Sequence, residues 1–181
     1  IIKDIPEMRT FAVENLAQIL VDILTSCAAN ESPAPAPVLS LTIAILTVLT
    51  EAPKGSALER SQYSLADYSE LIKKTVLPLE VQRLALQACI KLFDDPKRFE
   101  QQETHLLALV ANLTMSRELA TEVLKSGFIE KMIALPVTAL PSLNSIYYHT
   151  FFQSILENIV EDDALLFEKM KVLITKTISS R

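Results

Sequence analysis

The chain has 181 residues, of which 50% are hydrophobic and 22% charged, with a net charge of −5. This length suits one domain or several repeat units, and the hydrophobic content excludes a disordered chain. No segment gathers Lys and Arg into a stripe that could neutralise phosphates, so we expect no nucleic-acid partner. Nine Pro and only two Gly favour helices over sheets or nucleotide-binding loops, which use Gly in tight turns.

The first predicted element is a helix from about Pro6 to Ala29. Proline is tolerated in the first turn of a helix, and Pro6 takes that position. Residues 30–37 (NESPAPAP) then force extended backbone through repeated X-Pro steps and end the helix. Between these limits, apolar residues recur at steps typical of a helix: Phe11, Leu16, Ile19, Leu20, Ile23 and Leu24.

A second helix is expected over residues 38–51, which are apolar almost all the way round. The apolar part, 38–49, falls short of the ~20 residues that a membrane-spanning helix needs. We therefore expect a buried core helix and no membrane partner. A strand would also fit the alternation, but the length and the helical neighbours favour a helix; the alternating residues are Leu39, Leu41, Ile43 and Ile45.

The middle of the chain is expected to contain a loop and two helices. Residues 52–63 show no clear period and are expected to form a loop open to proteolysis. Ser64 begins a short predicted helix that runs to about residue 76. Pro78 then starts a helix that ends at 94–96 (DDP), with one apolar face made of Val81, Leu84, Ala85, Ala88 and Leu92.

The prediction for the last third of the chain depends on one glycine, Gly127. A helix over 99–114 is followed by a short amphipathic helix with Ser116 as its cap. Gly127 then takes the position where a left-handed residue closes a helix, and Phe128 begins another short helix. We therefore predict a corner between two packed helices at Gly127. A long helix is expected after Pro141, and a final one opens at 161–163 (EDD), where negative charge suits the helix dipole.

Nothing in the sequence indicates catalysis. Cys27 and Cys89 lie in apolar helical patterns, which favours two buried thiols in a reducing compartment over a disulfide or a metal site. Neither His105 nor His149 has a metal-ligating residue three or four positions later. No phosphate loop, nucleophile elbow or HExxH motif occurs. We expect no enzyme activity, cofactor or metal.

The order of short helix, glycine corner, second helix and longer third helix resembles an armadillo repeat. Residues 111–136 (ANLTMSRELATEVLKSGFIEKMIALP) are similar to that family's junction, in which an Asn-Leu pair ends one repeat and a Gly opens the second helix of the next. Such pairs occur at Asn15, Asn112 and Asn158, and the last two are 46 residues apart, near the ~40 to 47 of this repeat class. The resemblance covers about 101–160. The first 77 residues resemble only the wider class of helical-hairpin solenoids, such as HEAT repeats.

We therefore predict an all-α, armadillo-like right-handed superhelix of stacked helices in a single domain over 1–181. N-terminal helices occupy 1–51, a loop 52–63 and repeats 64–181. Each hairpin has an apolar stripe too wide for its own partner to cover, so neighbours must stack. An all-helical globular bundle is the alternative. The chain does not open with Met, and we expect a fragment of a larger cytoplasmic protein, with the nucleus left open.

The resemblance implies a concave groove lined by the third helices, in which the recurring Asn holds the backbone of an extended peptide. Helical spacing gives one stripe of candidate residues on each third helix, and we expect the stripes to lie side by side. The partner-binding candidates are Gln101, His105, Asn112, Tyr147, Phe151, Ser154 and Asn158. Alternatively, the Asn side chains only satisfy neighbouring backbone groups. The chain lacks the Trp that family members pair with Asn to hold nuclear-import signals, so we do not expect import cargo.

The sequence thus predicts a non-catalytic scaffold that binds a partner protein or an extended peptide. Two alternatives stay open. The chain could be a structural or self-associating segment of a longer solenoid, with its apolar ends covered by neighbouring repeats. It could also be a regulatory or substrate-binding domain of a larger enzyme, such as a ubiquitin ligase or a kinase.

Overall fold

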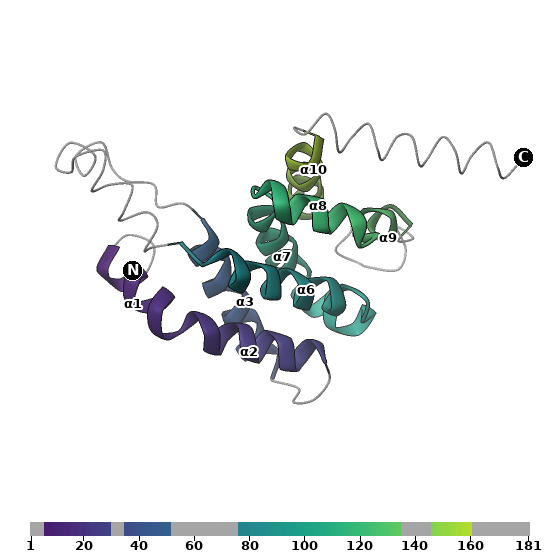
Figure 1. The fold of residues 1–181 in the computed structure, drawn as a ribbon. Coiled ribbons are helices and arrows are strands. Elements are labelled where there is room, and N and C mark those ends of the chain that lie inside the picture. The colour runs from purple at the N-terminus through teal and green to yellow at the C-terminus, as the bar shows by residue number, and fades with distance from the viewer. Residues whose placement is uncertain (1–5, 30–34, 52–75, 135–145, 161–181) are drawn as a thin grey trace, which may run out of the picture. The chain divides into compact units, whose positions relative to one another are not determined.

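The structure is a computed structural model that describes residues 6–29, 35–51, 76–134 and 146–160. These residues form eight helices and no strand (Figure 1), which confirms the all-α class. The expected loop at 52–63, the short helix expected from Ser64 and the final helix expected after 161 lie outside the described residues. The chain divides into two compact units, 1–112 and 113–181, and each is described by itself.

The first unit is centred on α2 (Ala17–Ala28), which lies between α1 (Pro6–Asn15) and α3 (Ala36–Thr50) in the chain. Helix α2 packs against α3 and also against α6 (Leu79–Phe93), while α1 packs against α2 and α3. Helical spacing explains the contacts, since residues three and four apart share a face. On α2 that buried face consists of Ala17, Val21, Leu24 and Cys27, and on α3 of Leu39, Thr42, Ile43, Leu46 and Leu49.

The single helix predicted over 6–29 is wrong in one respect, because it is bent by 52° at Leu16. Just before the bend, the Asn15 side-chain amide donates a hydrogen bond of 2.9 Å to the backbone carbonyl of Phe11. Side-chain bonds to the carbonyl four residues back compete with the helical ladder and bend helices. The bend therefore coincides with the first Asn-Leu pair of the sequence.

Helix α6 follows Pro78, which lies just before the helix rather than within its first turn. The apolar face predicted for it is partly wrong, since Leu84 is 43% exposed. The stripe that is buried is centred one position later along the helix, so that it includes residues outside the predicted face. Its members are Ala85, Leu86, Ala88, Cys89, Leu92 and Phe93.

Polar contacts join α3 to α7 (Pro96–Leu113) within the same unit. The buried Gln102 side chain accepts a hydrogen bond of 2.6 Å from the Ser40 hydroxyl and donates one of 3.2 Å to the Ala36 carbonyl. Both bonds satisfy an amide that would otherwise be costly to bury. They also fix where the N-terminal half of α7 lies along α3.

A second polar contact holds the other end of α3. Arg9 of α1 is 1% exposed, and its guanidinium donates a hydrogen bond to the backbone carbonyl of Glu51, which follows α3. Burial lowers the pKa of Arg9, and the charge of Glu51 opposes that shift. The cation of α1 therefore points into the unit, away from the surface.

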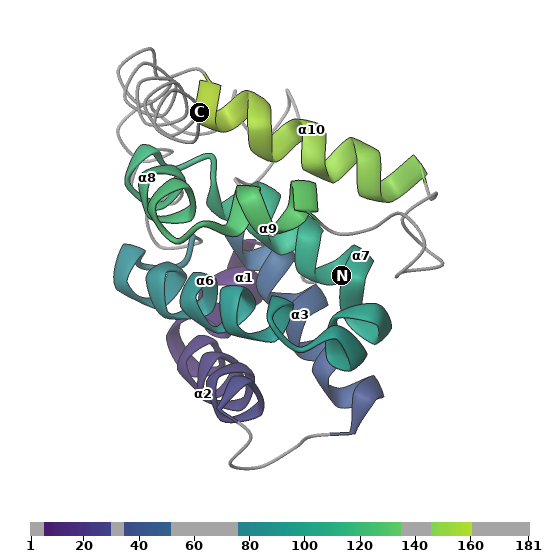
Figure 2. The same cartoon turned by 90° about the vertical axis from the view of Figure 1, so that its right-hand side faces the viewer.

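The second unit contains α8 (Arg117–Lys125), α9 (Phe128–Ala134) and α10 (Ile146–Val160), with α8 packed against both others (Figure 2). The predicted corner is confirmed: Gly127 has φ +76° and joins α8 to α9. The Ser126 hydroxyl donates to the Val123 carbonyl at 2.7 Å and accepts from the Phe128 amide at 3.2 Å. These bonds satisfy backbone groups that the helix ends leave open.

Within the described ranges, no single helix is long and apolar enough to cross a membrane. Among the described helices, one pair bent by 52°, Met8–Asn15 with Ala17–Ala28, passes that test together, by length and composition alone.

Candidate functional site

The side-chain amide of Asn112, the first candidate, makes a hydrogen bond within its own unit. Asn112 lies near the end of α7, is partly buried and donates a hydrogen bond of 3.2 Å to the backbone carbonyl of Thr47 on α3. Thr47 precedes it by 65 residues. This contact is of the kind that the structural alternative predicted for the recurring Asn, an amide that satisfies a neighbouring helix.

The second candidate amide, that of Asn158, also has a partner in its own unit. Its side chain on α10 donates a hydrogen bond of 3.0 Å to the hydroxyl of Thr114, which is 1% exposed. Thr114 immediately follows α7 in the chain. The bond therefore fixes the C-terminal part of α10 against the start of the second unit.

The remaining candidates differ in how far they reach solvent. His105 on α7 is exposed, whereas Phe151 and Ser154 on α10 are half-buried. The side chains of Gln101 and Tyr147 lie outside the described part of the structure. Phe151, Ser154 and Asn158 share one face of α10, because they follow each other at steps of three and four.

The two predicted stripes belong to different compact units. His105 and Asn112 lie in the unit 1–112, and Phe151, Ser154 and Asn158 lie in the unit 113–181. That the stripes lie side by side in one groove stays a prediction. Within each unit, the candidate residues of one helix lie on the same face of that helix.

Both cysteines of the chain lie among the described residues, in the core of the first unit. Cys27 and Cys89 are both buried thiols, as the sequence predicted. Burial raises the pKa of Cys89 to about 12, so its thiol stays protonated and poorly nucleophilic at neutral pH. Within the described ranges, no group of three or more His, Cys, Asp or Glu side chains could hold a metal ion.

The sequence reasoning missed an exposed apolar surface on α1 and α2. Phe11, Leu16 and Ile19 belong to the apolar pattern that predicted the first helix, yet they lie at the surface, as does Met8. The buried apolar side chains of the two helices form a second series that shares only Leu24 with the predicted pattern: Ala12, Ala17, Val21, Leu24 and Cys27. The signal was present in the sequence, because one helix carrying two apolar series must leave part of one uncovered.

Comparison with known proteins finds no match for this chain among protein-family models, curated proteins or solved structures. The relation to armadillo and HEAT repeats stays a prediction from the residues themselves.

Proposed function

We propose that this chain is a non-catalytic protein-interaction scaffold, built as an armadillo-like right-handed superhelix. It binds a partner protein or an extended peptide on the faces of its third helices, α7 and α10. The supporting observation is the face of α10, where the half-exposed ring of Phe151 and the half-exposed Ser154 precede the amide of Asn158 at helical spacing.

This combination suits an extended peptide for chemical reasons. A partly exposed aromatic ring supplies apolar contact area at low cost in side-chain entropy. A serine hydroxyl can donate to or accept from the peptide backbone. His105, exposed on α7, provides a further polar contact on the other third helix.

The structure changes which residues are best suited to test the proposal. The amides of Asn112 and Asn158 already donate to Thr47 and Thr114, so their replacement would alter stability as well as any partner contact. Variants at the three more accessible positions separate the two effects. These are His105, Phe151 and Ser154.

The test compares the wild-type protein with a His105→Ala, Phe151→Ala, Ser154→Ala variant in affinity capture from cell extract, followed by affinity measurement with each retained protein. Val160→Ala is the matched control, since Val160 is 45% exposed at the end of the same helix. We expect the triple variant to lose tenfold or more in affinity, about 1.4 kcal/mol, with unchanged circular dichroism. If the wild type, the triple variant and the Val160→Ala control retain the same partners with equal affinity, this face is removed from the proposal.

A further inference from the structure

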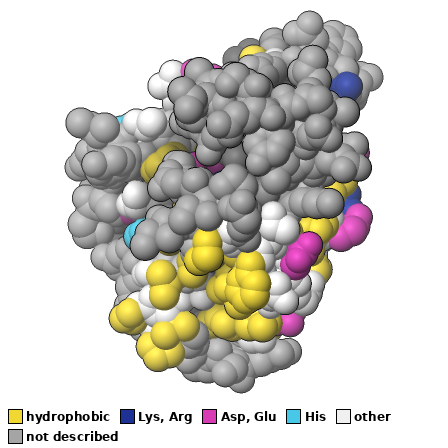
Figure 3. All heavy atoms as spheres, turned by 90° about the vertical axis from the view of Figure 1, so that its left-hand side faces the viewer, with side chains coloured by type: hydrophobic (Ala, Val, Ile, Leu, Met, Phe, Trp, Pro, Cys, Tyr) yellow, Lys and Arg dark blue, Asp and Glu magenta, His cyan; other side chains and the backbone are white. Residues whose placement is uncertain are grey.

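The bend between α1 and α2 carries a row of exposed apolar side chains, which we call the elbow surface. It consists of Met8 and Phe11 on α1, Leu16 at the bend and Ile19 on α2, which are 42%, 56%, 37% and 55% exposed. The face of the molecule that bears α1 shows hydrophobic side chains gathered together (Figure 3). Contiguous exposed apolar surface of this kind marks interaction sites, whereas single exposed apolar residues are ordinary.

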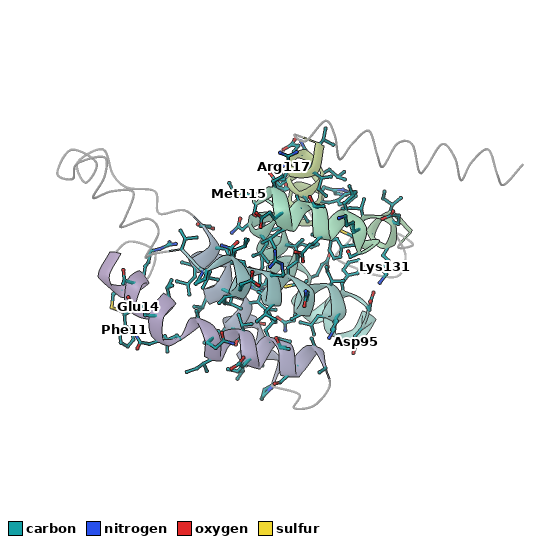
Figure 4. All side chains as sticks on the ribbon, in the orientation of Figure 1. Phe11, Glu14, Asp95, Met115, Arg117 and Lys131 are labelled. Atoms are coloured by element: carbon teal, nitrogen blue, oxygen red, sulfur yellow. The ribbon has the colours of Figure 1, made fainter. Side chains whose placement is uncertain are left out.

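Acidic and amide side chains follow the elbow surface along the same two helices. Glu14, Gln18 and Asp22 are all exposed and lie four residues apart, a spacing that keeps them in one row. The Gln18 amide donates a hydrogen bond of 2.8 Å to the Asp22 carboxylate, which fixes part of the row. Phe11 and Glu14 both belong to α1 and are labelled in Figure 4.

The charge of this region has one sign at the surface. Among the described side chains of residues 8–29, the exposed charged groups are the carboxylates of Glu14 and Asp22. The one cation there, Arg9, is 1% exposed and donates to the Glu51 carbonyl. An apolar row beside a row of carboxylates is complementary to a ligand that combines an apolar stripe with cations along its edge.

We propose that the elbow surface binds an amphipathic helix of a partner protein, with an apolar stripe and Lys or Arg along one edge. Met8 to Ile19 covers about three helical turns, so a segment of about 12 residues matches its length. Helices bind in this way through apolar residues at steps of three and four. This interaction is independent of the one proposed for α7 and α10.

Charge distinguishes this occupant from two others. A second copy of the elbow surface would bring the same carboxylates, those of Glu14 and Asp22, and no exposed cation among the described side chains of 8–29, so like charges would meet. An anionic lipid surface would repel the same carboxylates, because membrane-binding helices carry Lys and Arg on their polar face. Of these three occupants, the cationic amphipathic helix is the one that is complementary to both the apolar row and the carboxylates.

The experiment measures binding of two fluorescently labelled 18-residue amphipathic peptides with the same leucine stripe, one with lysine and one with glutamate along its edge. We expect the lysine peptide to bind the full chain at least tenfold more tightly than the glutamate peptide. Phe11→Ser with Ile19→Ser should abolish the binding, and Glu14→Lys with Asp22→Lys should reverse the preference. Leu41→Ser is the matched control, since Leu41 on α3 is 61% exposed outside the elbow surface, and it should leave binding unchanged.

Four outcomes would overturn the proposal. The first is equal affinity for the two peptides, and the second is no binding of either. The third is a dimer in analytical ultracentrifugation that Phe11→Ser with Ile19→Ser dissociates, which would assign the surface to a second copy. The fourth is co-sedimentation with phosphatidylserine vesicles that the same variant abolishes, which would assign it to a membrane.

Discussion

The left-handed backbone at Gly127 is the clearest case of one residue setting the path of the chain. Its φ of +76° is accessible to glycine at no steric cost, whereas an L side chain there costs roughly 1–2 kcal/mol. A Cβ added at this position would meet no atom within 4 Å beyond those of its two chain neighbours. The cost of a substitution therefore comes from the backbone alone.

Gly127→Ala should lower the free energy of unfolding by about 1 kcal/mol, measured by urea denaturation followed at 222 nm. Gly127→Asn is the informative companion, because asparagine tolerates the left-handed region better than alanine does. We expect the Asn variant to lose less stability than the Ala variant. Equal stability of Gly127→Ala and the wild type would mean that the corner does not need a positive φ.

Single residues also show why the candidate site was harder to predict than the corner. The conformation of Gly127 can be predicted from its neighbours in the sequence, because one helix ends before it and another begins after it. The partner of Asn112 is the carbonyl of Thr47, 65 residues earlier, and no local pattern could identify it. Sequence spacing therefore placed Asn112 on a face of its helix but could not say which neighbouring group that face meets.

At the scale of the element, α3 settles the ambiguity between strand and helix that its alternating residues left open. Residues Ala36–Thr50 form a helix, and the residues of the apparent alternation fall on different sides of it. Leu39 and Ile43 are buried, whereas Leu41 is 61% exposed. Alternation in a short apolar run does not distinguish the two structures; the length of the run does.

This difference between faces gives a paired prediction on one helix. Leu46→Ala should lower the free energy of unfolding by about 2–5 kcal/mol, because Leu46 is 0% exposed and its loss leaves a cavity. Leu41→Ala should change it by no more than about 0.5 kcal/mol, because that side chain is at the surface. Both values come from the same urea titration. Similar losses for the two variants would show that α3 is oriented differently from the structure described above.

The bend at Leu16 shows the limit of periodicity in predicting an element. The apolar pattern of residues 6–29 continues through the bend, so it predicted one helix. The bend coincides with a side-chain hydrogen bond, from Asn15 to the carbonyl of Phe11, which a hydropathy pattern does not register. The exposure of Phe11 and Ile19 was missed for a related reason, since periodicity gives a face but not what covers it.

At the scale of the whole molecule, the unit 1–112 has the features of a part that folds on its own. Its buried side chains come from α1, α2, α3, α6 and α7, and α3 meets α7 through Gln102 and Asn112. Domains are recognised by such a core, with the stabilising contacts made within the unit. The second unit is smaller and contributes α8, α9 and α10.

A fragment of residues 1–116, which ends after the last turn of α7, should therefore be helical and unfold cooperatively on heating. A shorter fragment, 1–95, lacks α7 and with it the side chains that bond the carbonyls of Ala36 and Thr47, so it should lose the cooperative transition. Circular dichroism at 222 nm against temperature measures both. Leu46→Ala in the longer fragment should lower its melting temperature, because Leu46 belongs to the core of the first unit. A gradual, non-cooperative loss of signal from 1–116 would mean that the first unit depends on residues beyond Ser116 for its stability.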